Sequence, residues 1–211
     1  MEKSALDISN HLKNRTLDRL VENRAAYSLE QAEITVYETH QCMYDVAFQT
    51  NVPLLACMIS GKKIMHVNGN PAFEFLPGES VIIASDEECL IDFPDASEIS
   101  PTACMKPAIS PERIASFCDE LNEHYPYMDL QGGWHYEPNE RKIVNDIMIN
   151  QLLNRLILIC TENNTAKEYF SDLVLKELLV RLMQTRAGIF CYTSSSIRMC
   201  NVIVEKLKFK G

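Results

Sequence analysis

Glycine and tryptophan are scarce in this chain: seven of its 211 residues are glycine and one is tryptophan. The glycines form no cluster of the kind whose backbone N–H groups cradle phosphate, which excludes a Gly-rich nucleotide loop. No apolar run approaches the roughly 20 residues that a membrane helix needs. The first residues, Met1 to Ser4, lack the basic segment and apolar stretch of a secretory signal. We therefore expect a cytoplasmic protein with no membrane partner.

Motifs for covalent or acid–base catalysis are also missing. None of the five histidines lies near a serine or cysteine in a nucleophile motif such as Gly-x-Ser-x-Gly. The eight cysteines form no Cys-x-x-Cys pair and mostly have apolar neighbours, which is typical of small buried residues. Cys191 and Cys200, in a polar tail, are the first candidates for redox activity. The sequence predicts no catalytic residue and no cofactor.

Negative charge is concentrated in one part of the chain. The formal net charge is −9, but residues 30–130 contain 17 acidic and 4 basic side chains. An acidic surface repels phosphate and is a poor surface for nucleic acid. If the protein acts on DNA, we expect the contact to be made elsewhere.

Short strands dominate the first half of the chain. A helix is predicted from about Ser9 to Arg24, because leucines recur at helical spacing after a capping serine. From Glu33 the apolar period changes to two, which predicts seven or eight short antiparallel strands in a β-barrel or jelly roll. These include residues 44–48, 54–59, 64–67, 72–75, 80–84, 89–93 and 102–109. The Ser-Gly-Lys-Lys stretch at residues 60–63 indicates a hairpin.

A Pro-Gly turn at Pro77 and Gly78 joins two of these strands. Proline presets φ and glycine tolerates positive φ, so residues 73–83 are predicted to form strand, turn and strand at one corner of the barrel. Inward positions alternate in a small barrel and can enclose one ligand. Each residue expected around such a ligand also fits a plain core position. They are Tyr44, Phe48, Met58, Met65, His66, Phe73 and Phe93, with Trp134 and Tyr136 as a lid.

A metal site is not expected. The stretch from Gly61 to Gly78 resembles the cupin motif, in which two histidines, a glutamate and a distant histidine hold a transition metal. Here His66 and Glu74 are present, but Asn68 takes the place of the second histidine and residues 85–87 contain no histidine. A functional metal needs three or four convergent ligands. The motif therefore indicates a fold and no metal.

Helical periodicity dominates the second half of the chain. Ser110, Pro111 and Glu112 are typical of a helix start and predict a helix to about His124. Two further helices are predicted at about 140–161 and 166–186, and both are apolar beyond a single stripe. The apolar side chains outside that stripe favour burial in an isologous homodimer, and a helical hairpin buried within one domain is the alternative. The expected interface residues are Leu152, Leu156, Leu173, Leu175, Leu178, Leu179 and Leu182.

Three segments together resemble the N-terminal domain of AraC-type transcriptional regulators over roughly residues 12–190. They are residues 34–40 (Ile-Thr-Val-Tyr-Glu-Thr-His), residues 58–104 with the Pro-Gly-Glu-Ser turn, and residues 173–185. The resemblance implies a cupin-like barrel that binds a small-molecule effector and a pair of helices that forms a homodimer. It also implies DNA binding, but only through a C-terminal helix-turn-helix region that is missing from this chain.

The expected organisation is an α+β fold with an N-terminal helix, a cupin-like β-barrel or jelly roll of short antiparallel strands, and a C-terminal helical hairpin. The expected parts are a helical arm (1–24), the barrel with its following helix (30–124), a loop (125–139), dimerisation helices (140–188), and a linker with the start of the missing helix-turn-helix domain (189–211). The expected function is that of a regulatory fragment of an AraC-type regulator. The alternatives are a metal-dependent cupin enzyme and a stand-alone small-molecule-binding or redox-sensing protein.

Overall fold

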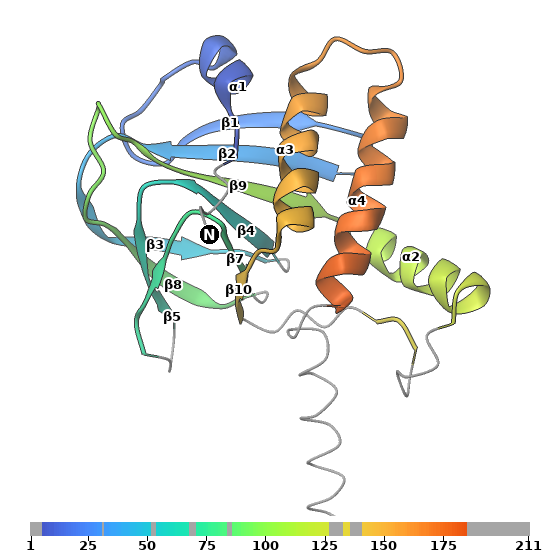
Figure 1. Ribbon diagram of the computed structural model, residues 1–211. Coiled ribbons are helices and arrows are strands. Elements are labelled where there is room, and N and C mark those ends of the chain that lie inside the picture. The colour runs from blue at the N-terminus through green and yellow to red at the C-terminus, as the bar shows by residue number, and fades with distance from the viewer. Residues whose placement is uncertain are drawn as a thin grey trace, which may run out of the picture.

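Two antiparallel sheets lie face to face, and two long helices cover the outer side of the larger one (Figure 1). The computed structural model describes residues 6–30, 32–51, 54–67, 71–83, 86–126, 133–135 and 141–184. The larger sheet has the order β1 (Asn23–Ser28), β2 (Ala32–Thr39), β9 (Thr102–Ile109), β4 (Leu54–Ser60), β7 (Glu79–Ile83) and β10 (Arg141–Val144). The smaller sheet has the order β3 (Met43–Gln49), β8 (Glu88–Phe93), β5 (Lys63–Val67) and β6 (Phe73–Phe75). The described helices are α1 (Ser9–Asn14), α2 (Pro111–His124), α3 (Ile147–Thr161) and α4 (Lys167–Gln184).

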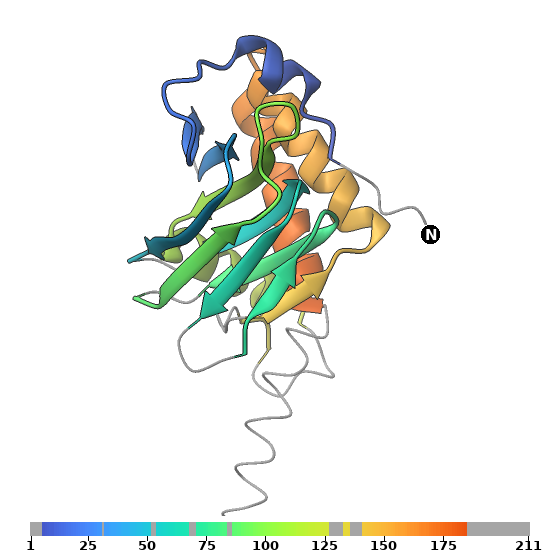
Figure 2. The ribbon, with the colours of Figure 1, turned by 90° about the vertical axis from the view of Figure 1, so that its left-hand side faces the viewer.

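Strands β2 and β9 separate two hydrophobic cores. Val36 pairs with Met105 across these strands, and both pack in one core with Leu153 of α3. The next pair, Tyr37 and Cys104, belongs to the core between the two sheets. Successive side chains of a strand point to opposite faces. The larger sheet is therefore buried on both sides, and Figure 2 shows the helices behind its strands.

The predicted hairpin at residues 60–63 is wrong. β4 pairs with β7 and β9 in the larger sheet, whereas β5 pairs with β6 and β8 in the smaller one. Gly61 has a φ of 74°, and a Cβ atom there would lie 2.4 Å from Thr102 Oγ1 and 2.8 Å from Thr102 Cα. Only glycine tolerates this conformation and close approach, so the turn packs against β9 and carries the chain from one sheet to the other.

The Pro-Gly corner crosses between the sheets in the same way. β6 and β7 occupy the two halves of the predicted strand–turn–strand segment, which is confirmed, but they belong to different sheets. Gly78 has a φ of 79°, and the N–H of Leu76 donates to Glu79 Oε2 at 2.8 Å. The Lys142 ammonium on β10 lies 3.0 Å from the same carboxylate. The corner is thus held by a buried glutamate as well as by turn geometry.

The N-terminal helix is present but ends at Asn14 instead of near Arg24. Arg15 is extended, and its Nε donates to the buried carboxylate of Glu38 on β2 at 2.5 Å. Asn23 then organises the following loop, because its side chain accepts from the N–H of Asp18 and donates to the carbonyl of Thr16. These contacts favour an extended segment over further helical turns, and residues 23–28 join the sheet as β1.

The predicted helix at 140–161 also begins later than expected. Residues 141–144 form β10, which pairs with β7, and α3 begins after Asp146, whose side chain accepts from the N–H of Ile149 at 2.8 Å. Four residues, of which Ile143 and Val144 are apolar, are too few to distinguish strand from helix by their period. Residues 141–144 are a strand because they pair with β7, which is distant in sequence.

The α+β fold class is confirmed, with an N-terminal helix, antiparallel strands in two sheets and C-terminal helices. Within the described ranges the sheets form a sandwich and not a closed barrel. The helix predicted from Ser110 is confirmed, and the Ser110 hydroxyl accepts from the N–H of Arg113 at 3.2 Å. None of the described helices is long and apolar enough to cross a membrane.

We expect Leu153→Ala to lower the free energy of unfolding by about 2–5 kcal/mol, because it leaves a cavity under α3. Leu153 is 0% exposed, whereas Leu158 on the same helix is 39% exposed. Leu158→Ala is the matched control and should cost about 1 kcal/mol or less. Urea denaturation followed by circular dichroism measures both variants. Equal losses would contradict the assignment of the Leu153 face to the core.

Candidate ligand-binding site

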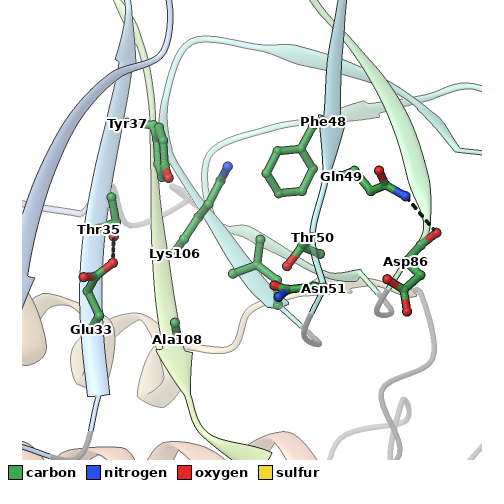
Figure 3. Close-up of a pocket in the computed structure, with 11 residues that line it drawn as sticks. Glu33, Thr35, Tyr37, Phe48, Gln49, Thr50, Asn51, Asp86, Lys106 and Ala108 are labelled. Carbon is green, nitrogen blue, oxygen red and sulfur yellow. Dashed lines mark hydrogen bonds between the residues drawn. The ribbon is translucent and has the colours of Figure 1, made fainter.

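A cavity of about 490 Å³ opens at one end of the sandwich, where β2 and β9 face the end of β3 (Figure 3). Ligand pockets in proteins have volumes of roughly 300–1,000 Å³. One wall consists of Glu33, Thr35 and Tyr37 from β2 with Lys106 and Ala108 from β9. The remaining lining residues are Phe48, Gln49, Thr50, Asn51, Leu54 and Asp86.

Lys106 is the most unusual residue of this cavity. It is 5% exposed, and its ammonium lies 4.0 Å from the ring centroids of both Tyr37 and Phe48. Among the described residues, its Nζ has no hydrogen-bond acceptor. An ammonium has three hydrogens to donate. The faces of the two rings attract the charge, but they leave those donors unsatisfied.

A second buried lysine lies nearby and has two hydrogen-bond acceptors. Lys63 Nζ on β5 is 3.2 Å from Glu22 Oε1 and 3.1 Å from Cys104 Sγ. The other oxygen of Glu22 lies 3.8 Å from Lys106 Nζ, beyond hydrogen-bond distance. Glu22 has a left-handed φ of 48°, and its N–H donates to Thr39 Oγ1 at 3.1 Å. This turn places one carboxylate beside two ammonium groups, so positive charge is in excess.

The pKa values reflect this arrangement. Burial lowers the pKa of Lys106 below its ordinary value of 10.5 despite the nearby Glu22. Burial acts in the same direction on Lys63, but Cys104 and Glu22 outweigh it, and the pKa of Lys63 is raised. Burial alone would raise the pKa of Glu22, but the two ammonium groups outweigh it and lower that pKa. Lys106 is therefore the member whose charge is least compensated.

A second hollow, of about 660 Å³, lies along β3, β8 and β5. It is lined by Phe48, His66 and Leu90, among others. His66 Nε2 lies 2.8 Å from Asp92 Oδ2. The pKa of Asp92 is held below its ordinary value, mainly because the N–H of Asp45 donates to its carboxylate. His66 acts in the same direction. The imidazole of His66 is thus already paired with Asp92, and none of the described residues that line this hollow is a buried cation like Lys106, which makes it a weaker candidate than the cavity at Lys106.

The residues predicted around a ligand are only partly brought together. Phe48 lines both hollows and His66 lines the second. Met58, Met65 and Phe93 are buried in the core between the sheets, Phe73 packs against that core, and Tyr44 is exposed. Trp134 packs with α2 and α4 in a third core, and its Nε1 donates to the carbonyl of Tyr125 at 2.8 Å. Tyr136 lies outside the described residues.

Sequence reasoning missed Tyr37, Lys106, Lys63 and Glu22. A signal for two of them was present, because Lys63 and Lys106 are among only four basic residues in the acidic stretch 30–130. Lys106 also interrupts an otherwise apolar strand between Met105 and Pro107. A lysine within a strand that reads as buried is rare unless it is paired or functional.

Within the described part of the chain, no three His, Cys, Asp or Glu side chains are grouped to hold a metal ion. Glu74, from the cupin-like stretch, lies 3.6 Å from the Lys62 ammonium. Five of the six described cysteines are buried. Burial raises the pKa of Cys57 and of Cys160 to about 12. Cys191 and Cys200 lie outside the described residues.

The leucines predicted at a dimer interface lie mostly inside the chain's own core. Leu173 on α4 is 48% exposed. The other six are buried within the chain, where they pack against the larger sheet, the neighbouring helix of the α3–α4 pair or α2. They are Leu152, Leu156, Leu175, Leu178, Leu179 and Leu182. Other apolar side chains on these helices are exposed, namely Ile147, Met148, Leu158 and Tyr169.

Sequence comparison identifies the family of this chain. The sequence model of the AraC-type transcriptional regulator N-terminus matches residues 31–189. This range includes β2, β9, the cavity wall that they form, and both C-terminal helices. Among curated protein sequences, none matches the chain.

Several solved structures align with this chain at low sequence identity. ToxT from Vibrio cholerae aligns with a TM-score of 0.51 and 10% identity, over 74% of this chain and 57% of the ToxT chain. The cupin domain of Schizosaccharomyces pombe Cnp3 aligns with a TM-score of 0.40 and 14% identity, over 50% of this chain and 76% of that domain. DMSP lyase DddQ from Ruegeria pomeroyi aligns with a TM-score of 0.36 and 15% identity, over 46% of this chain and 52% of the lyase chain. The likeness to ToxT shows the fold.

We expect Lys106→Met to raise the free energy of unfolding at neutral pH by about 1 kcal/mol or more, because it removes a buried charge that lacks a hydrogen-bonded partner. Lys63→Met should lower it by about 2 kcal/mol, because it removes the hydrogen-bonded partner of Glu22. Both variants replace a buried lysine by methionine, so each controls for the other in volume and hydrophobicity. Urea denaturation measures the difference.

The gain from Lys106→Met should depend on pH. The pKa of Lys106 is lowered in the folded state, so the unfolded chain binds more protons between the folded pKa and 10.5. The stability of the wild type relative to Lys106→Met therefore rises with pH through this window, and the gain shrinks. A gain that grows toward alkaline pH, or a loss of stability in Lys106→Met at neutral pH, would contradict the account of Lys106 given above.

Proposed function

Because the chain belongs to the AraC-type transcriptional regulators, as the match over residues 31–189 shows, we propose that it is the regulatory part of such a regulator. It binds a small-molecule effector in the cavity between β2, β9 and β3. It forms a homodimer through α3 and α4, and effector binding changes the arrangement of that dimer. In this proposal the protein acts in the cytoplasm as a sensor and catalyses no reaction.

The observation that carries the proposal is that the same two strands wall the cavity and support the helices. Tyr37 and Lys106 point into the cavity from β2 and β9. Their neighbours Val36 and Met105 point the opposite way and pack in one core with the leucines of α3. An effector shifts an equilibrium between two arrangements by its difference in affinity for them. A ligand that favours one position of these strands therefore acts on the core in which α3 packs.

Exposed apolar side chains on the helices support the homodimer. Tyr169 and Leu173 lie one turn apart on the exposed side of α4, and Ile147 is exposed at the start of α3. A second copy of the same surface buries such a patch in an isologous contact. Of the seven leucines predicted at the interface, Leu173 is the one that is free to make this contact. The others connect the helices to the protomer.

The sandwich is a poor candidate for the DNA contact. Residues 30–130, which form most of it, contain 17 acidic and 4 basic side chains. Such a surface repels the phosphate backbone. We propose that DNA is bound by a helix-turn-helix region outside the 211 residues, and that the dimer helices transmit the effector state to it.

We expect the wild-type chain to sediment as a dimer at micromolar concentration and Leu173→Glu to sediment as a monomer. The carboxylate would be buried without a partner in the contact between α4 helices, which is strongly unfavourable. Leu17→Glu is the matched control, because Leu17 is 47% exposed and lies in the N-terminal segment away from α4. Sedimentation velocity measures all three proteins.

A wild-type chain that sediments as a monomer would refute the proposed homodimer. Loss of the dimer in Leu17→Glu, with Leu173→Glu unaffected, would move the interface to the N-terminal segment. Circular dichroism of the three proteins separates dissociation from unfolding, because both leucines are substantially exposed in the protomer.

A further inference from the structure

The buried charges around the cavity do not balance. Two ammonium groups, Lys63 and Lys106, lie beside one carboxylate, Glu22. Lys63 takes the hydrogen-bonding position on that carboxylate, and Lys106 remains at 3.8 Å. A buried charge without a hydrogen-bonded partner costs several kcal/mol in general. A site with one uncompensated positive charge therefore favours a ligand with one negative charge.

The uncompensated ammonium is presented to the cavity. Lys106 lines the cavity, and 5% of its surface is exposed. Figure 3 shows its side chain extending from β9 toward the space between Tyr37 and Phe48. The two rings flank the ammonium at equal distances of 4.0 Å and leave its free donors available to a group that enters the cavity.

We propose that the cavity binds an organic monocarboxylate, whose carboxylate accepts hydrogen bonds from Lys106 between the rings of Tyr37 and Phe48. This inference rests on the proposed function, since it names the chemical class of the effector. A carboxylate that accepts from an ammonium forms a charge-assisted hydrogen bond, about twice as strong as a neutral one. The bound anion would bring the net charge of the two lysines and Glu22 to zero.

The surrounding charges favour a single negative charge over two. Glu22 lies beside Lys106, and the exposed Asp86 lines the cavity, so both repel an additional anionic group. Glu33 also lines the cavity, but its carboxylate is paired with Arg24. A phosphate dianion would need a second free cation, but Lys63 is already bound to Glu22 and Cys104. A dicarboxylate would place its second carboxylate toward Asp86.

The lining also defines the rest of the ligand. Leu54, Ala108 and the faces of the two rings provide apolar contact for a carbon skeleton. Gln49 and Asn51 are exposed polar residues of the lining. A volume of about 490 Å³ accommodates a small organic acid. The expected ligand therefore has one carboxylate, an apolar middle and a distal end that is neutral or a hydrogen-bond donor.

The test compares each acid with its uncharged amide and with anions that have more charge. Hexanoate and phenylacetate are the monocarboxylates, their primary amides are the neutral analogues, and adipate and inorganic phosphate are the anions with more charge. Each is titrated at constant ionic strength into the wild-type chain, Lys106→Met, Lys106→Gln and Lys13→Met. Lys13 is an exposed lysine on α1 and controls for the general loss of a positive charge. Thermal unfolding and isothermal titration calorimetry report binding.

We expect at least one of the two monocarboxylates to raise the unfolding temperature of the wild type and of Lys13→Met. Its affinity should fall about tenfold or more in both Lys106 variants, which corresponds to one charge-assisted hydrogen bond. The amides, adipate and phosphate should bind more weakly than the monocarboxylates. Because Lys106→Gln keeps a polar side chain of similar length, it shows whether the charge itself is needed if Lys106→Met alters the packing.

Three results would overturn the inference. They are the absence of binding by both monocarboxylates, equal binding by an acid and its amide, and unchanged binding in the Lys106 variants. Sedimentation of the same samples tests the proposed function separately. Carboxylate binding that depends on Lys106 but leaves self-association unchanged would support the ligand class and refute the coupling to the dimer. A dimer that binds none of the probes would refute the ligand class alone.

Discussion

The pairing of β2 with β9 is the constraint on which the rest of the structure depends. Their register places Val36 opposite Met105 and Tyr37 opposite Cys104, so one set of side chains faces α3 and the other faces the smaller sheet. The side-chain period of a strand is two, and a slip by one residue would exchange the two faces. It would move Lys106 among the leucines of α3 and Met105 into the cavity. Both buried faces thus specify the same register.

A buried group of three charged side chains joins segments that are far apart in the chain. Glu22 precedes β1, Lys63 lies on β5 of the smaller sheet, and Lys106 lies on β9 of the larger one. Lys63 and Glu22 have their hydrogen bonds, whereas Lys106 has ring faces and an open cavity. The buried charge of Lys106 therefore lowers the stability of the fold. Lys106 lines the cavity from β9, and its neighbour Met105 on the same strand packs in one core with α3. The strand is therefore in contact with both the cavity and the helices.

Local signals in the sequence were sufficient where the determining contacts are local. The cap at Ser110, the strand at 102–109 and the helix at 167–184 were all predictable, because a capping serine, a short apolar segment and a long apolar segment are local signals. The N-terminal helix was predicted too long, because the salt bridge between Arg15 and Glu38 and the hydrogen bonds of Asn23 were not visible in a periodicity. The strand β10 was missed for a similar reason, since its partner β7 is distant in sequence.

The sequence by itself determined the fold class, the acidic character of the sandwich, the Pro-Gly corner and the family to which the chain belongs. The tertiary structure decided which strands pair, and therefore where the cavity lies. Met58, Met65 and Phe93 fit a core and a pocket equally well in a sequence pattern, and the facing of the two sheets placed them in the core. The same facing brought Lys63 and Lys106 to one carboxylate. Charge compensation is a property of neighbours in space, and in this chain those neighbours come from different sheets.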